Sequence, residues 1–177
     1  MPFGLSILPA GAARSAALGA MLAGQGVGFL DATIAGSSVQ VRAGQAIVMA
    51  GGEETAFASA REILSCFGKE VFHVGPWGSG ARMKLVVNLV LGLNRAVLAE
   101  GLTLAGALEL DLPTTLAILK ASPAYSTVMD TKGEKMLSGD FAPQARLSQH
   151  LKDVRLILAA GAQTGVPLPL SSIHQQL

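Results

Sequence analysis

The stretch HVGPWGSGARMKLVVNLVLGLNRAVLAEGLTLAG, from His73 to Gly106, joins a glycine-rich turn to a long apolar segment. Gly75, Gly78 and Gly80 allow a sharp bend and close backbone approach, because they carry no side chain. The sustained apolar residues that follow predict one helix over residues 82–109. The position of this helix decides how the rest of the chain is organised.

Lys84 and Asn88 stand at the start of this helix and lie about 40° apart around it and about 6 Å apart along it. Both side chains can therefore reach one small ligand, whereas Arg95 lies roughly 16 Å beyond Lys84. The start of the helix also favours a carboxylate or phosphate. A lysine placed there can exchange a proton with a substrate oxygen. The alternative is that both residues form only the polar side of a connecting helix.

Before the glycine turn, β-like runs alternate with helical patterns. Strands are predicted at 3–8, 27–34, 45–52 and 70–75, and helices at 12–26 and 53–68. This alternation with short connections is typical of an α/β domain. The first strand has no obvious neighbour that would protect its edge.

After about residue 80 the sequence contains only helical patterns. Further helices are predicted at 113–121, about 127–137 and 143–164, and another begins at Pro169 with eight residues after it. We therefore predict a partial Rossmann-type domain over 1–79 and an all-helical domain over 80–177 whose last helix is truncated. The chain is expected to be the middle of a longer protein.

The composition argues against a membrane or a nucleic acid as the partner of this chain. Half of the 177 residues are hydrophobic, and the mean hydropathy is +0.48. The longest uncharged run in the most apolar segment, 85–94, falls short of the roughly 20 residues that span a bilayer, so a buried helix is expected. A net charge of +1 provides no field for a nucleic acid or membrane surface. We expect a cytoplasmic protein that acts on a small molecule or contacts another protein.

Cysteine and histidine give little sign of a metal site. Cys66 is the single cysteine and is expected to be a core thiol, because it stands at an apolar position of a predicted helix. His73, His150 and His174 are far apart in sequence without the spacing of metal ligands. We expect no bound metal, and a structural or solvent-facing role for His73.

The string GPWGSGARMKLVVN, residues 75–88, resembles the G-x-x-G-x-G-x-x-x-K-x-x-x-N signature of the β-hydroxyacid dehydrogenases. This family includes 3-hydroxyisobutyrate dehydrogenase and tartronate semialdehyde reductase and is related to 6-phosphogluconate dehydrogenase. Blocks at 29–52, 67–84 and 145–170 are similar to further family segments in the same order. The resemblance covers nearly the whole chain.

The resemblance implies an NAD(P)-binding Rossmann domain followed by a helical domain, with the active site in the cleft between them. It also implies hydride transfer between NAD or NADP and a small β-hydroxy acid or semialdehyde, in a homodimer or homotetramer. By position, Lys84 would be the general acid/base, Asn88 would orient the substrate, and Lys152 would approach the cofactor. Backbone N–H groups of Gly36 and Ser37 would hold the substrate carboxylate.

The sequence departs from the family at the cofactor site. It contains no strand followed by G-x-G-x-x-G, the turn that holds a dinucleotide pyrophosphate, so we expect this part to lie upstream of Met1. The choice between NAD and NADP cannot be read from this chain. Ala35 and Ile7 stand where the family has Ser and Thr. The alternative function is a dehydrogenase fragment without turnover that acts only as a helical dimerisation module.

Three further residues keep two interpretations each. Asp31 is expected to end a strand just before the substrate loop, residues 35–37, and could cap the turn by bonding to its backbone or have a functional role. Trp77 could form a wall of the pocket or pack between domains. Asp153 could orient Lys152 or could be an exposed helix charge.

Overall fold

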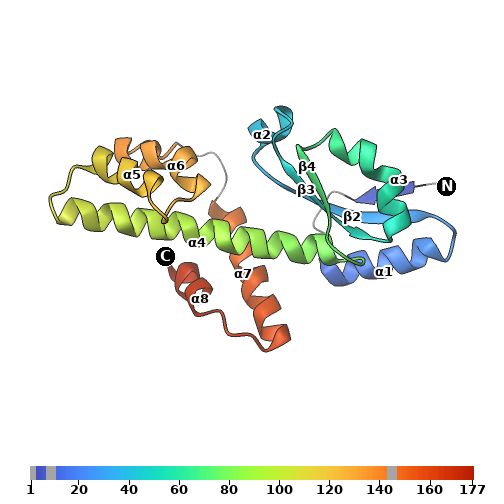
Figure 1. Cartoon of the computed structure of the whole chain (residues 1–177). Helices are drawn as coiled ribbons and strands as arrows, with labels where there is room; N and C mark the ends of the chain where they lie inside the picture. The colour runs from blue at the N-terminus through green and yellow to red at the C-terminus, as the bar shows by residue number, and fades with distance from the viewer. Residues whose placement is uncertain (1–2, 7–10, 143–146) are drawn as a thin grey trace. The chain divides into compact units, whose positions relative to one another are not determined.

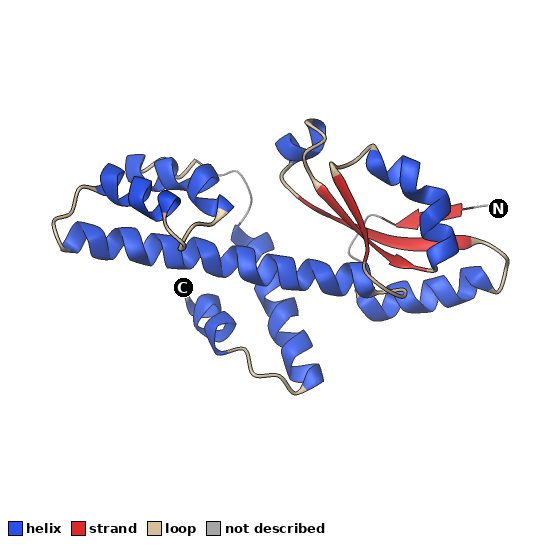
Figure 2. Ribbon diagram, viewed as in Figure 1, coloured by secondary structure: helices blue, strands red, loops and turns tan. Residues whose placement is uncertain are grey.

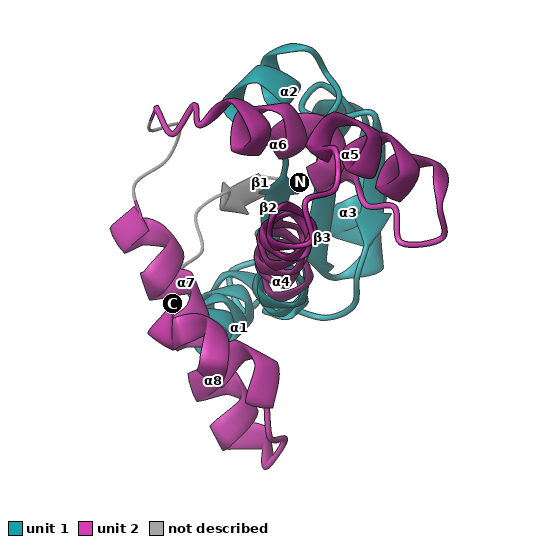
Figure 3. Ribbon diagram, turned by 90° about the vertical axis from the view of Figure 1, so that its left-hand side faces the viewer, with its two compact units in different colours: residues 1–87 teal, residues 88–177 magenta. Residues whose placement is uncertain are grey.

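The computed structural model of the 177-residue chain describes residues 3–6, 11–142 and 147–177, with no side chains described for 3–6. The described residues form two compact units, 1–87 and 88–177, coloured separately in Figure 3. The long helix α4 (Ser79–Ala107) begins in the first unit and continues into the second. The predicted boundary at residues 79 and 80 falls at the start of this helix.

The first unit is a four-stranded sheet with helices, as predicted (Figure 2). Its strands are β1 (Phe3–Ser6), β2 (Gly28–Ala35), β3 (Ile47–Gly52) and β4 (Glu70–His73), in the order β1-β2-β3-β4. β1 is parallel to β2, β2 is antiparallel to β3, and β3 is parallel to β4. β1 therefore has a neighbour on one side, β2, which the sequence did not reveal.

Two long helices belong to this sheet, α1 (Ala12–Ala23) and α3 (Glu54–Ser65). Helix α3 places Ala56, Ala60 and Leu64, four residues apart, against Leu30 and Val48 of the sheet. This apolar layer is the core of the first unit. Burial of these side chains is the main favourable contribution to its folding.

Two expectations for the first unit were wrong or incomplete. Cys66 is exposed rather than buried, because it lies about 200° around the helix from the inward-facing Leu64. The short helix α2 (Ser38–Arg42) was not predicted. It begins with a capping box in which the Ser37 hydroxyl accepts from Gln40 N–H and the Gln40 side chain accepts from Ser37 N–H.

The described residues of the second unit form helices and no strand. Figure 1 shows α5 (Leu112–Ala121) and α6 (Thr127–Ser138) beside α4, and Leu98, Leu102, Leu116, Val128 and Met129 form their shared core. Helices α7 (Leu147–Thr164) and α8 (Pro169–Gln176) pack against each other. Residues 143–146, the predicted start of the fourth downstream helix, lie outside the described residues.

The expectation that the apolar helix is buried was wrong for this chain. Val90, Val97, Leu104 and Leu108 of α4 are all more than half exposed. Within the described ranges, α4 is the one helix that is long and apolar enough to cross a membrane. The same length and composition occur in domain helices that pack against a partner, so this is weak evidence for a span.

Candidate active site

Strand β2 holds the first turn of α4 through three successive contacts. Asp31 is buried, and its carboxylate accepts from Gly78 N–H at 2.9 Å and Ala81 N–H at 3.1 Å. Thr33 is also buried and donates to the Gly80 carbonyl at 2.9 Å. These bonds join residues 47 to 50 positions apart in sequence. They fix the direction in which the helix leaves the sheet.

Gly80 makes this close approach possible. A Cβ atom there would lie 2.1 Å from the Asp31 carbonyl oxygen and 2.9 Å from the Met49 carbonyl oxygen. Any side chain would therefore push α4 away from β2 and β3. The glycine turn read from the sequence serves backbone packing.

The same contacts correct two expectations from sequence. The protein's own Asp31 binds the first amides of α4, so this helix start does not receive a substrate anion. Asp31 also lies within β2 rather than at its end. A buried acid this far away in sequence could not be identified as a helix cap from local pattern.

Lys84 stands one turn after Gly80 and points back to the end of β2. Its half-buried side chain donates from Nζ to the Ile34 carbonyl oxygen at 2.7 Å. Ile34 directly precedes the substrate loop, residues 35–37. The structure thus brings the predicted general acid/base beside the predicted substrate loop.

The substrate loop has one position that requires glycine. Gly36 has φ +152°, and a Cβ there would lie 3.1 Å from Ala46 Cβ. The N–H of Ser37 donates to Gln40 Oε1 at 2.8 Å. A substrate carboxylate would therefore meet Gly36 first, and would have to displace the Gln40 side chain to reach the Ser37 amide.

Asn88 lies one turn beyond Lys84 on α4 and donates from Nδ2 to Asp153 Oδ2 of α7 at 3.2 Å. A carboxylate can only accept, so this bond turns the amide oxygen of Asn88 away from Asp153. Asp153 thus positions Asn88, which is a third role beside the two considered from sequence. The neighbouring Lys152 is exposed.

Trp77 packs within the first unit. Its Nε1 donates to the Phe29 carbonyl oxygen at 3.0 Å, and its ring covers Gly19 of α1, where a Cβ would lie 2.4 Å from the ring. Both contacts lie inside the first unit. Trp77 therefore helps to fix α1 and the glycine turn to the sheet.

His73 has a structural role, and His150 lies beside His174. His73 binds the Gly52 carbonyl oxygen at 2.7 Å and stacks on Phe57, a structural role. His150 and His174, 24 residues apart in sequence, have their Nε2 atoms 3.2 Å apart. Among the residues that the structure describes, no group of three or more potential metal ligands occurs.

Comparison with known proteins decides the family. Residues 78–177 match the family model described as NAD-binding of NADP-dependent 3-hydroxyisobutyrate dehydrogenase. This chain belongs to the β-hydroxyacid dehydrogenases. Residues 9–75 match the NAD binding domain of 6-phosphogluconate dehydrogenase. The Rossmann-type and helical parts predicted from sequence are confirmed, as is a family that uses NAD or NADP.

Relatives extend this result. The chain is 37% identical over 154 residues to 2-(hydroxymethyl)glutarate dehydrogenase of Eubacterium barkeri, covering 86% of this chain and 51% of that protein. It is 31% identical over 162 residues to the cytokine-like nuclear factor N-PAC of Xenopus tropicalis, covering 92% of this chain and 30% of that protein. The dehydrogenase match therefore spans about half of that relative's length.

A solved structure supports the fold. Mycobacterium tuberculosis 3-hydroxyisobutyrate dehydrogenase superposes with a TM-score of 0.87 at 23% identity, covering 99% of this chain and 64% of that one. At this identity the similarity concerns the fold alone.

Proposed function

We propose that this chain provides the substrate-binding and proton-transfer residues of an NAD(P)-dependent dehydrogenase of small β-hydroxy acids, of the 3-hydroxyisobutyrate or 2-hydroxy-3-oxopropionate type. The observation that carries the proposal is the Lys84 ammonium 2.7 Å from Ile34 O, beside the substrate loop. We also retain 1–79 and 80–177 as the proposed domains, and the cytoplasm as the proposed location.

In the proposed reaction Lys84 protonates the carbonyl oxygen of the aldehyde or keto acid during reduction. In the oxidation direction the neutral amine takes the proton of the substrate hydroxyl. Because Asp153 holds the amide nitrogen of Asn88, the amide oxygen accepts a hydrogen bond from the substrate. The N–H groups of Gly36 and Ser37 are the proposed partners of the substrate carboxylate.

The nicotinamide, when bound, supplies or receives the hydride. Two helix starts in the first unit do not suit the phosphates of the dinucleotide. Helix α3 follows Glu53 and begins with Glu54, whose negative charges would repel a phosphate. The first amides of α4 already bind Asp31. The start of α1 adjoins residues 7–10, which lie outside the described residues. Lys152, an exposed cation, remains the proposed cofactor contact, and we derive no step through the cofactor.

The alternative proposal is a dimerisation module without turnover. It is favoured by the similarity to N-PAC, a protein named as a nuclear factor, and by the exposed apolar side of α4. Val90, Val97 and Leu104 are spaced seven residues apart, so two antiparallel copies could pair Val97 with itself and Val90 with Leu104. A homodimer or homotetramer is proposed under either function.

Turnover separates the two proposals. A panel of small β-hydroxy acids would be offered with NAD and with NADP to a fusion of this chain behind a family strand–glycine-turn–helix segment, following nicotinamide absorbance. Saturable oxidation supports the dehydrogenase, and a folded fusion that binds cofactor but turns over no member supports the module. The chain by itself is expected to show no saturable NAD(P)H binding by calorimetry, and micromolar binding would contradict our view of the phosphate site.

Sedimentation tests the dimer. Val97→Glu places two like charges at the proposed two-fold axis and should shift the chain to monomer. Val39→Glu, the same change at another exposed valine, is the control. Equal effects of the two substitutions would contradict pairing through α4.

A further inference from the structure

Arg95 of α4 is a half-buried cation that makes no ion pair with the residues that the structure describes. Its Nε atom is buried and makes no hydrogen bond. Within the described ranges, the ion pairs join Lys120 to Asp130 and Lys135 to Asp140, and neither involves Arg95. A guanidinium nitrogen removed from water in this way is costly unless an acceptor compensates it.

Other basic groups surround Arg95 within the second unit. Burial first, and then the charges of Arg95 and Lys135, lower the pKa of Lys132 on α6. On α7, burial, then His174 and then Arg95 lower the pKa of His150, while Asp153 opposes this shift. Arg95 of α4, Lys132 of α6 and His150 of α7 are therefore close enough for their positive charges to repel one another.

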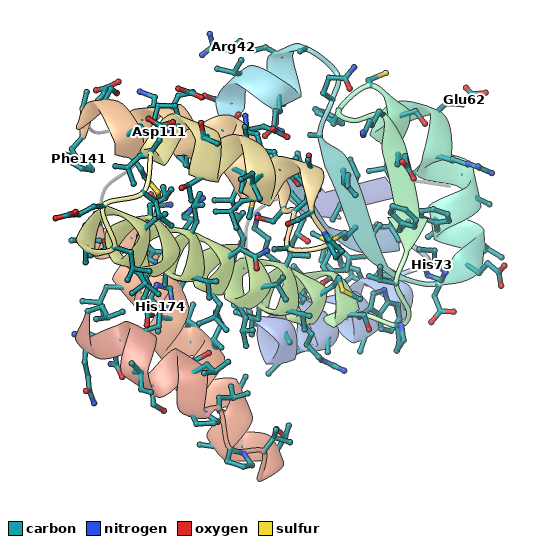
Figure 4. All side chains as sticks on the ribbon, turned by 60° about the vertical axis from the view of Figure 1, so that its left-hand side comes forward. Arg42, Glu62, His73, Asp111, Phe141 and His174 are labelled. Carbon is teal, nitrogen blue, oxygen red and sulfur yellow. The ribbon has the colours of Figure 1, made fainter. Side chains whose placement is uncertain are left out.

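The imidazoles of His150 and His174 lie close to the backbone of α4 at Gly92, which has no side chain to exclude them. A Cβ at Gly92 would lie 2.8 Å from His174 Cε1 and 3.1 Å from His150 Cε1. Figure 4 shows His174 between α8 and α4. Gly92 precedes Arg95 by about one turn, so the ring pair and the guanidinium share one side of the helix.

A groove of about 1510 Å³ opens over this place. Arg95, Lys132, Lys135, His150 and His174 line it, together with apolar side chains such as Leu104 and Leu151. Two acids also line it, Glu100 and Asp140, and Asp140 is paired with Lys135. The groove therefore combines a basic centre with an apolar wall.

We propose that the groove at Arg95 binds a small carboxylate or sulfate-like anion, with the guanidinium of Arg95 as its principal partner. A planar guanidinium offers paired N–H donors that match two oxygens of such an anion. The site is separate from the proposed catalytic lysine, since Lys84 and Arg95 are eleven positions apart on α4, which corresponds to about 16 Å of rise. It does not depend on the chain being a dehydrogenase.

Binding at this site is linked to protons. An anion offsets the positive charge of Arg95 and makes a proton on His150 more favourable, so His150 gains protons when the anion binds. By linkage the anion binds more tightly as the pH falls through the titration of His150. Sulfate is a suitable probe because its charge is constant over this range.

The test is a calorimetric titration of the full chain with sulfate, and separately with succinate, at constant ionic strength in chloride. We expect one saturable site per chain, tighter at pH 6 than at pH 8. Arg95→Gln should weaken sulfate binding about tenfold or more, since a charge-assisted hydrogen bond contributes at least this factor. Arg155→Gln, at an exposed arginine of α7, is the matched control and should change nothing.

Three outcomes would overturn the proposal. The first is that sulfate binding does not saturate beyond the chloride background. The second is that Arg95→Gln binds sulfate as tightly as wild type does. The third is that Arg95→Gln loses self-association rather than sulfate affinity. The last outcome would mean that a second copy supplies the carboxylate. If Arg95→Gln does not fold, Arg95→Lys keeps the charge without the planar fork and should still weaken binding, with helicity confirmed by circular dichroism.

Discussion

The first turn of α4 and the turn around Arg95, near the middle of this helix, differ in how their polar groups are satisfied. At its first turn, backbone amides bind Asp31, the Gly80 carbonyl binds Thr33, and Lys84 binds Ile34 O. Around Arg95, basic groups repel one another and a buried guanidinium nitrogen has no acceptor. The contacts of the first region lie within this chain and hold Lys84 in place, whereas the second region is where we propose that an anion binds.

The largest expected effect on stability comes from Asp31→Ala. The substitution leaves Gly78 N–H and Ala81 N–H buried without an acceptor, so we expect a loss of about 2–4 kcal/mol in the free energy of unfolding. Urea denaturation measures it. Asp111→Ala removes a cap that is exposed, at the start of α5, and is the control. If Asp31→Ala loses no more stability than Asp111→Ala, the bonds from Asp31 to the start of α4 are unimportant for stability.

A pair of glycine substitutions on α4 tests packing at its start against a free surface further along. Gly80→Ala should destabilise by about 1–3 kcal/mol, because its Cβ meets the Asp31 carbonyl. Gly101→Ala meets nothing within 4 Å and should stabilise by about 0.5–1 kcal/mol through helix propensity. Thermal unfolding of both variants should give opposite signs, and a shared sign would refute the distinction.

The smallest expected effect is a dependence of stability on pH from His150. Its pKa is lowered in the folded state, chiefly by burial, so the unfolded chain takes up a proton first as the pH falls below about 6.5. The contribution of His150 is therefore present above this pH and is lost as the pH falls toward the lowered folded pKa. His150→Gln should lose less stability than wild type between pH 7.5 and 5.5. Parallel pH profiles would contradict this.

Much of the fold could be predicted because it depends on local pattern. Apolar spacing predicted the strands and long helices to within a few residues, and the signature over 75–88 proposed roles for Lys84 and Asn88. Helix α2 could also have been predicted, since Ser37 and Gln40 form a readable capping box. It was not predicted because it has five residues and no apolar periodicity.

Other features depend on contacts that a linear pattern does not contain. Asp31 reaches Gly78 across 47 residues, and His150 meets His174 across 24. Asp153 binds Asn88 across 65 residues. Cys66 was misplaced because its neighbours are apolar, although the helix turns its side chain outward. Residue type indicated the candidate groups, but only the fold showed their contacts.

The most direct test of the account is the turnover number of Lys84→Ala in the fusion that carries a complete cofactor domain. Removal of the general acid/base should lower kcat by about 10²–10⁴-fold, with the unfolding transition retained. Lys69→Ala, at an exposed lysine of the same unit, should leave kcat unchanged. Near-normal turnover by a folded Lys84→Ala protein would contradict the central claim that β2 holds Lys84 in place for proton transfer.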